Sequence, residues 1–349
     1  MSRKPETKAG PDGGSDSPTT AAEIKRRAQS LSRDQLLGLL DDKELFASLD
    51  QFLQGDLLTR LAHLDPQVAV QRALDGTIPE NAFKGIRLNP NFFVNHKEFA
   101  SGLLKTLDPA DPLQGLVLSK VYMAGLEGAP AVVAESLLIR SKGNPTLQMP
   151  SGYRTALMHL YSSNPAQAVS VVTANTEEGS RERLSSFFFI GQEIPKKPGS
   201  EITLGLDSIP NKDLEALTAG KTAGLLRSGN ANGLDLLKTL PNEGLVRVIS
   251  QQPSFAGLCK IDPQAAVDLI SRIEMPTEGT GAMEEAAYTL VRLNNKDMVS
   301  DWISQQPDSE KRAAVLKGSI KRLEEISAPD LDDWKKQLAG ATSSNAEHE

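Results

Sequence analysis

The stretch of this sequence best suited to binding chemistry is residues 181–197, where cations surround a run of aromatic residues. Phenylalanines flanked by cations can hold an apolar peptide, a lipid surface or unstacked bases. The alternative is structural, because Leu184, Phe187 and Ile190 recur at helical spacing and would form the buried stripe of an ordinary helix. We favour the structural interpretation. The candidate partner-binding residues are Arg181, Arg183, Phe187, Phe188, Lys196 and Lys197.

Residues of catalytic type are present, but their spacing fits no reaction centre. Ala219-Gly220-Lys221-Thr222 is similar to the end of a phosphate-binding loop, yet Glu215 stands where that loop needs a glycine. We expect a loop between two helices there. The sequence has no Gly-x-Ser-x-Gly motif, and adjacent acids such as Glu284-Glu285 are typical of a solvated helix face. We therefore predict no catalytic residues and a protein that is not an enzyme.

Histidine and cysteine give no support for a metal or a cofactor. The histidines do not form the His-x-x-x-His spacing that places two ligands on one helix face. His63 and His159 each precede an Asp-Pro or Asn-Pro step, so we expect both to end helices. Cys259 is the only cysteine, which excludes an internal disulfide and a cysteine-based zinc site. We expect it to be a buried small hydrophobic residue.

The elements that would carry these residues are helices, and a recurring motif marks where some of them begin. Asp65-Pro66, Asn164-Pro165 and Asp262-Pro263 each place a capping side chain before a proline at the first helical position. An apolar stripe follows each of them. The three motifs are spaced by about three times 33 residues, which is typical of stacked helical hairpins.

Similar helix starts fill the intervals between these motifs. Successive starts are separated by roughly 31 to 35 residues, the size of a unit of two short helices with their turns. The predicted starts are Pro66, Lys97, Pro130, Pro165, Pro198, Ala231, Pro263, Asn295 and Pro329. Ala69, Ala168 and Ala266 follow the capped prolines by three residues, so we expect equivalent close contacts between neighbouring hairpins. The sequence predicts an all-α fold, an α-solenoid with a period of about 33 residues.

Composition and charge indicate the domain boundaries and the classes of partner that the chain could bind. We expect disordered tails at residues 1–20 and 339–349, and a helical-repeat array over 21–338. Residues 176–210 interrupt the array as an inserted loop or as a seam, and residues 201–206 alternate like a short strand. A net charge of −7 with scattered basic residues argues against a dedicated nucleic-acid binder. The sequence has no secretory signal or apolar span, so we expect a cytoplasmic protein.

On its period, its Asp/Asn-Pro helix starts and its alanine and valine stripes, the chain resembles α-helical tandem-repeat proteins of the tetratricopeptide and HEAT type. The Trp-Leu-Gly and Tyr residues of the tetratricopeptide consensus are missing, so the resemblance transfers no binding residues. It implies a non-catalytic scaffold that binds a protein or an extended peptide on a solenoid surface. One alternative is a nucleic-acid-binding helical repeat, and another is an enzyme on a helical scaffold.

Overall fold

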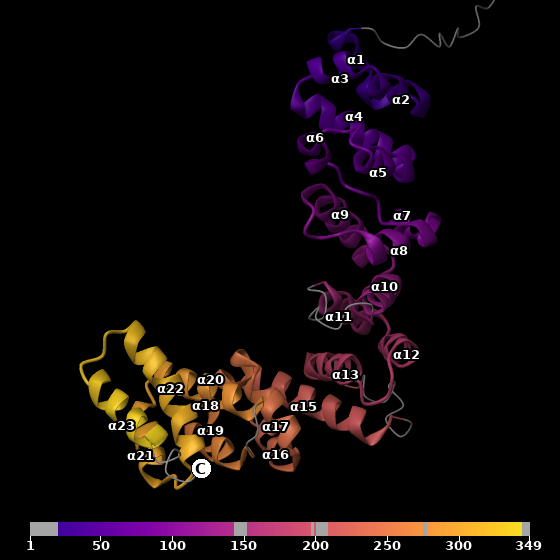
Figure 1. Ribbon diagram of the computed structural model, residues 1–349. Helices are drawn as coiled ribbons and strands as arrows, with labels where there is room; N and C mark the ends of the chain where they lie inside the picture. The colour runs from indigo at the N-terminus through magenta and orange to yellow at the C-terminus, as the bar shows by residue number, and fades with distance from the viewer. Residues whose placement is uncertain (1–19, 143–151, 197–198, 200–208, 275–277, 344–349) are drawn as a thin grey trace, which may run out of the picture. The chain divides into compact units, whose positions relative to one another are not determined.

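A computed structural model describes residues 20–142, 152–196, 199, 209–274 and 278–343 (Figure 1). Every element in these ranges is an α-helix or a short 3-10 helix, so the all-α prediction is confirmed for the described residues. The chain divides into two compact units, unit 1 over residues 1–136 and unit 2 over residues 137–349. The interruption predicted at 176–210 stays a prediction, and the strand-like residues 201–206 and the helix start at Pro198 lie outside the described residues.

Unit 1 is built from short helices. Its elements are α1 (Ala21–Arg27), the 3-10 helix η1 (Ala28–Ser30), α2 (Arg33–Asp41), α3 (Lys43–Ser48), α4 (Gln51–Leu64), α5 (Pro66–Leu74), α6 (Glu80–Lys84), α7 (Asn91–Asn95), α8 (Lys97–Thr106) and α9 (Pro112–Gly128), while α10 (Pro130–Lys142) crosses the unit boundary. α4 packs against α5 and α6, and α9 packs against α7 and α8. Phe83, Phe92 and Phe93 are buried in this unit.

The sequence suggested longer helices at the start of unit 1 than the structure has. The apolar spacing of residues 21–40 predicts one helix, but Ser32 begins a new one by forming a capping box with Gln35. Its hydroxyl accepts from the Gln35 backbone N–H, and the Gln35 side chain accepts from the Ser32 N–H. Asp50 likewise caps α4 and separates it from α3. Local capping therefore divides stretches whose leucine spacing alone reads as continuous helix.

Unit 2 contains longer helices that contact one another in series. Its elements are α11 (Tyr153–Ser163), α12 (Pro165–Asn175), α13 (Arg181–Glu193), η2 (Ile194–Lys196), α15 (Asn211–Arg227), α16 (Asn232–Thr239), α17 (Asn242–Ile249), α18 (Gln252–Ile261), α19 (Pro263–Arg272), α20 (Glu278–Arg292), α21 (Lys296–Gln305), α22 (Ser309–Glu325) and α23 (Leu331–Ser343). α13 packs on α15, α15 on α18, α18 on α20 and α20 on α22. One continuous core, mostly of alanine, leucine, valine and isoleucine, runs from Phe188 of α13 to α23.

Glycine lets the backbones of these helices touch. A Cβ placed on Gly220 of α15 would overlap the backbone carbonyl oxygen of Phe188 in α13, and one on Gly191 would overlap that of Leu217. Gly257 and Gly318 make the same kind of contact where α18 meets α15 and where α22 meets α20. Since Gly220 lies in the middle of α15, the loop expected at residues 219–222 is wrong. Here glycine serves close helix packing.

The predicted helix starts agree with the structure to within two residues wherever it describes them. Helices begin at Pro66, Lys97, Pro130, Pro165, Asn232, Pro263, Lys296 and Leu331. In the three capped motifs, the side chains of Asp65, Asn164 and Asp262 accept hydrogen bonds of 3.0–3.1 Å from the backbone N–H three residues later. Ala69, Ala168 and Ala266 are each 0% exposed, as expected for close contact positions.

The C-terminal helix extends further than composition suggested. The disordered tail was predicted from Ala339, but α23 continues to Ser343. Ala341 is buried in the core of unit 2, and the Thr342 hydroxyl donates to the backbone oxygens of Leu338 and Ala339. Small residues that read as a tail therefore pack as the last turn of a helix.

Candidate partner-binding groove

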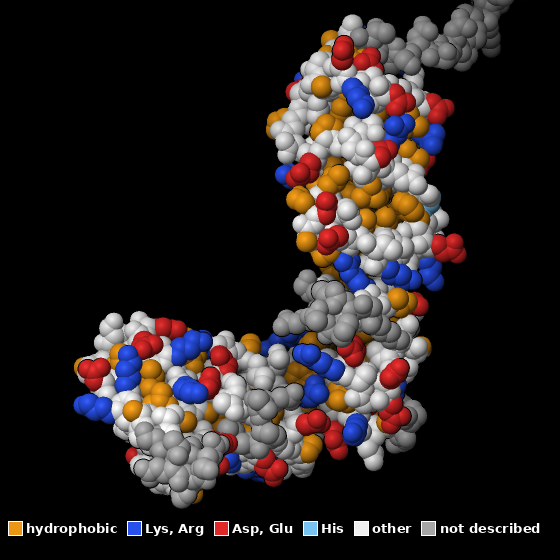
Figure 2. All heavy atoms as spheres, viewed as in Figure 1, with side chains coloured by type: hydrophobic (Ala, Val, Ile, Leu, Met, Phe, Trp, Pro, Cys, Tyr) orange, Lys and Arg blue, Asp and Glu red, His pale blue; other side chains and the backbone are white. Residues whose placement is uncertain are grey.

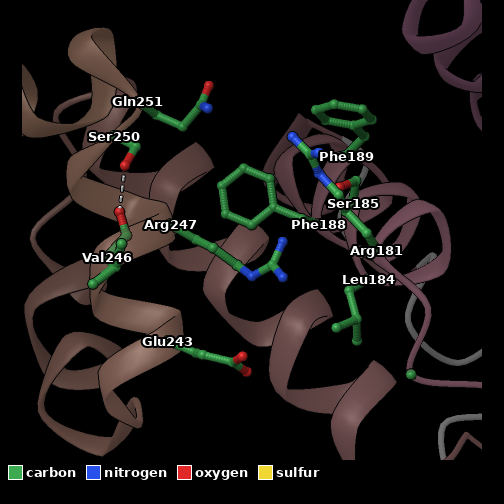
Figure 3. Close-up of a pocket in the computed structure, with 11 residues that line it drawn as sticks. Arg181, Leu184, Ser185, Phe188, Phe189, Glu243, Val246, Arg247, Ser250 and Gln251 are labelled. Carbon is green, nitrogen blue, oxygen red and sulfur yellow. Dashed lines mark hydrogen bonds between the residues drawn. The ribbon is translucent and has the colours of Figure 1, made fainter. Parts of the chain in front are cut away.

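A groove of about 630 Å³ lies between α13 and α17, both of which pack on α15 (Figure 3). Each helix presents one face to it, because the lining residues recur three and four positions apart. The α13 face carries Arg181, Leu184, Ser185, Phe188 and Phe189, and the α17 face carries Glu243, Val246 and Arg247, continued by Ser250 and Gln251. A surface composed of two helix faces is suited to an elongated ligand.

The aromatic part of the groove is held in place from below. The glycine contact between α13 and α15 fixes the backbone of Phe188 against Gly220, and the Phe188 side chain is 4% exposed. The half-buried Phe189 ring lies edge-on to it, with 6.3 Å between the ring centroids. The Arg154 guanidinium carbon lies 5.1 Å from the centroid of the Phe189 ring, where a cation is attracted to the ring face. These contacts give the groove a preformed apolar floor.

The Arg154 guanidinium sits beside the aromatic pair in a partly desolvated place. Its Nη2 donates to Oε1 of the buried Gln192 at 2.5 Å. Burial lowers the pKa of this guanidinium, and the nearby charge of Arg227 lowers it further. A guanidinium remains charged despite such a shift. Arg154 therefore adds a fixed positive charge next to the groove.

Two further cations line the groove without a carboxylate partner. Arg181 is exposed and Arg247 is half-buried, and neither forms an ion pair with any residue that the structure describes. Figure 3 shows Arg247 reaching from α17 toward Phe188, while Arg181 and Phe189 extend from α13 on the other side. Glu243 is the acidic residue of this lining. Guanidinium groups bind carboxylates and phosphates through paired hydrogen bonds, so the groove offers anion recognition next to an aromatic surface.

The structure brings some of the predicted site residues to the groove and leaves others inside the fold. Arg181 and Phe188 line it. Phe187 is fully buried, and Arg183 is 8% exposed, with its Nε donating to Asp213 Oδ2 at 2.6 Å. Lys196 donates to both carboxylate oxygens of Glu193 at 2.8 and 2.9 Å. Lys197 lies outside the described residues.

Sequence reasoning missed the α17 half of the groove. Arg247 lies some way along the chain from residues 181–197, and no local motif marks it. The apolar periodicity of 242–249 predicts a helix but does not indicate which element that helix faces. The polar edge of α17 becomes informative only once its packing on α15 is known.

The single cysteine of the chain, in unit 2, is a buried core residue and not a reactive one. Cys259 is 2% exposed, and burial raises the pKa of its thiol to about 12. The expectation of a buried small hydrophobic residue is confirmed. Among the residues that the structure describes, no three His, Cys, Asp or Glu side chains are grouped so that they could hold a metal ion. Within the same ranges, no helix combines the length and the apolar character needed to cross a membrane.

Comparison with protein-family models, with curated proteins and with solved structures finds no match for this chain. The functional argument therefore depends on the geometry and charge of the chain's own residues.

Proposed function

We propose that this chain is a non-catalytic scaffold of helical-hairpin repeats that binds a protein or an extended peptide, and that the groove between α13 and α17 is one of its binding surfaces. The observation that carries the proposal is the pair of arginines without carboxylate partners, Arg181 and Arg247, on either side of a fixed aromatic floor. A partner helix or extended segment lies naturally between two helix faces. An apolar side chain on Phe188 with carboxylates at the two guanidiniums would satisfy both features.

The repeat part of the proposal is supported by the spacing of long-range contacts. Side-chain hydrogen bonds between residues far apart in the sequence repeatedly span 30 to 40 positions, as expected when equivalent places in neighbouring repeats meet. Examples are Arg33–Asp65, Ser101–Ser136, Tyr153–Ser186, Gln252–Glu285 and Lys296–Asp330. Together with the confirmed helix starts, these spacings favour a unit of about 33 residues.

Charge favours a protein over a nucleic acid as the occupant. The chain has a net charge of −7, and Glu243 lies in the groove beside the two arginines. A nucleic-acid surface neutralises several phosphates at once, which needs a larger excess of cations. Two guanidiniums beside an aromatic ring instead match a short acidic and apolar peptide segment.

The test is affinity capture of the tagged full chain from an extract of its native cells. The unmodified chain is compared with Arg181→Glu/Arg247→Glu and with the control Lys260→Glu/Lys317→Glu, which makes the same charge change at exposed lysines of unit 2 outside the groove. We expect a discrete protein that the control retains and the groove variant loses. Identical captures by all three chains, or material removed by nuclease, would contradict the proposal.

A further inference from the structure

Unit 1 contains a second pocket, of about 540 Å³, in which basic side chains from three separate elements converge. His63 lies in the last turn of α4, Arg87 lies between α6 and α7, and Lys120 lies on α9. The pocket is separate from the groove of unit 2, and no sequence motif marks it. Its remaining lining comes from the segment 86–90 and from one face of α9.

The positive charges in this pocket are not balanced by nearby carboxylates. Lys120 is half-buried, and its Nζ donates to the backbone oxygen of Lys84 at 2.6 Å. Neither Lys120 nor Arg87 forms an ion pair with a carboxylate in the part of the chain that the structure describes. Burial lowers the pKa of Lys120, and the charge of Arg87 lowers it further, so the two cations are close enough to repel each other. Two like charges held close together raise the free energy of the protein, and a bound anion would lower it again.

The acidic residue that lines the pocket is Glu127. Glu127 follows Lys120 by seven residues on α9, which places it about 10 Å further along the helix axis. Between them Met123 lines the pocket and is 54% exposed. Apolar side chains also reach the surface of unit 1 elsewhere (Figure 2). The pocket therefore has a cationic end and an apolar wall next to it.

We propose that this pocket binds a phosphate monoester with an apolar organic group, with the phosphate between Arg87 and Lys120 and the organic group against Met123. A phosphate monoester carries close to two negative charges at neutral pH, which matches the exposed Arg87 and the half-buried Lys120 better than a single carboxylate does. His63 lines the same pocket and adds a further basic side chain to it. This site is independent of the partner-binding groove.

The test is calorimetric titration of the full chain with phenyl phosphate at neutral pH. We expect saturable binding that Arg87→Gln and Lys120→Met each weaken at least about tenfold, because each removes a charge-assisted contact. Lys97→Met is the control, since Lys97 is an exposed lysine of α8 that lines no pocket described here. Melting curves of all variants establish that they are folded.

Two competitors and one variant define what is recognised. Inorganic phosphate should displace phenyl phosphate, whereas benzoate, with the same ring and one negative charge, should displace it at least about tenfold less well. Met123→Gln should weaken phenyl phosphate and leave inorganic phosphate unchanged, because only the apolar contact is lost. The proposal is overturned if the unmodified chain does not bind phenyl phosphate, if Arg87→Gln binds it equally well, or if benzoate competes equally. None of these outcomes bears on the groove of unit 2.

Discussion

The two units bury the same kinds of residue but hold their helices together by different contacts. In unit 2, Gly191, Gly220, Gly257 and Gly318 allow one helix backbone to rest directly on another. In unit 1, Gly38, Gly55 and Gly102 have open space where a side chain would stand, and helices meet mainly through leucine and phenylalanine side chains. The exceptions lie on α9, where a Cβ on Gly128 would overlap the carbonyl of Pro90, one on Gly115 the carbonyl of Pro109, and one on Gly125 the side chains of Val133 and Phe93.

The two candidate sites also differ in their packing contacts. The groove lies between α13, which rests on α15 through Gly191 and Gly220, and α17, whose Gly244 is only in ordinary van der Waals contact with α15. The unit 1 pocket is lined by the segment 86–90 between α6 and α7, in which the Pro90 carbonyl lies close to Gly128 of α9. We expect the α13 side of the groove to tolerate larger core residues less well than its α17 side.

The largest effect should come from the feature that both units share. Ala69→Glu in unit 1 and Ala168→Glu or Ala266→Glu in unit 2 each bury an unpaired carboxylate at a position that is 0% exposed. We expect each to lower the free energy of unfolding by about 3 to 5 kcal/mol. Denaturant titration measures this, with Ala→Ser at the same positions as the size-matched control. Unchanged stability in all three variants would disprove the equivalence of the three contacts.

Two ion pairs of similar length, one from each unit, should differ in energy. Arg183–Asp213 in unit 2 is buried, with a distance of 2.6 Å, whereas Arg33–Asp65 in unit 1 has a similar distance of 2.7 Å but a half-exposed arginine. Asp213→Ala leaves a buried guanidinium unpaired and should destabilise unit 2 by about 3 kcal/mol. Arg33→Ala should change stability by no more than about 1 kcal/mol. Equal losses would show that burial does not separate the two pairs.

Glycine substitution tests the difference in helix packing directly. Gly220→Ala should destabilise unit 2 by about 2 kcal/mol, because the added methyl group meets backbone that cannot move without separating α13 from α15. Gly55→Ala, inside α4 of unit 1, should stabilise its helix by about 0.5 to 1 kcal/mol, because nothing stands in the way of its methyl group. Urea unfolding of both variants gives the two signs. A stabilising Gly220→Ala would remove the proposed basis of the unit 2 packing.

The smallest expected effect is a change in stability at acid pH that comes from one helix-capping residue, Asp65. Burial alone would raise the pKa of Asp65, but hydrogen bonds from Arg33 and from the Val68 N–H outweigh it and lower that pKa in the folded chain. A lowered folded pKa stabilises the protein above the unfolded pKa, and this stabilisation is lost as pH falls through the folded pKa. The difference in stability between the unmodified chain and Asp65→Asn should therefore shrink below about pH 4 and amount to less than about 1 kcal/mol.

Asn164 is the natural reference for this measurement. It caps α12 in unit 2 with the same geometry but cannot titrate. Asn164→Ala should lower stability by about 1 kcal/mol at every pH. A difference for Asp65→Asn that stayed constant from neutral to acid pH would indicate that the Asp65 charge contributes nothing.

Much of the local structure could be predicted, because it depends on neighbours in the sequence. The Asp-Pro and Asn-Pro steps gave the correct helix starts, since cap and proline act within one turn. The capping box of Ser32 and Gln35 was equally local and could have been read. Gly220 could not, because a glycine within a helix looks like a break until its contact with Phe188 is known.

The candidate groove could be predicted only in part, for the same reason. Arg181 and Phe188 attracted attention as cations and aromatics in one segment. Arg183 looks the same in the sequence, but it forms a buried ion pair with Asp213, 30 residues away, and so is not free to bind a partner. Arg247 completes the groove through the packing of α17 on α15, which no local pattern encodes.

The single thiol of Cys259 can report on the opening of unit 2. Because this is the only cysteine of the chain and it lies in the core of unit 2, a thiol reagent can react only when that core opens. An exposed thiol has a pKa of about 8.5, so opening of the core also restores the reactive thiolate that burial suppresses. The labelling rate of the unmodified protein therefore measures how often unit 2 opens. Opening of unit 1 does not affect this rate. Ligands of the groove should lower the labelling rate of Cys259, whereas ligands of the unit 1 pocket should leave it unchanged.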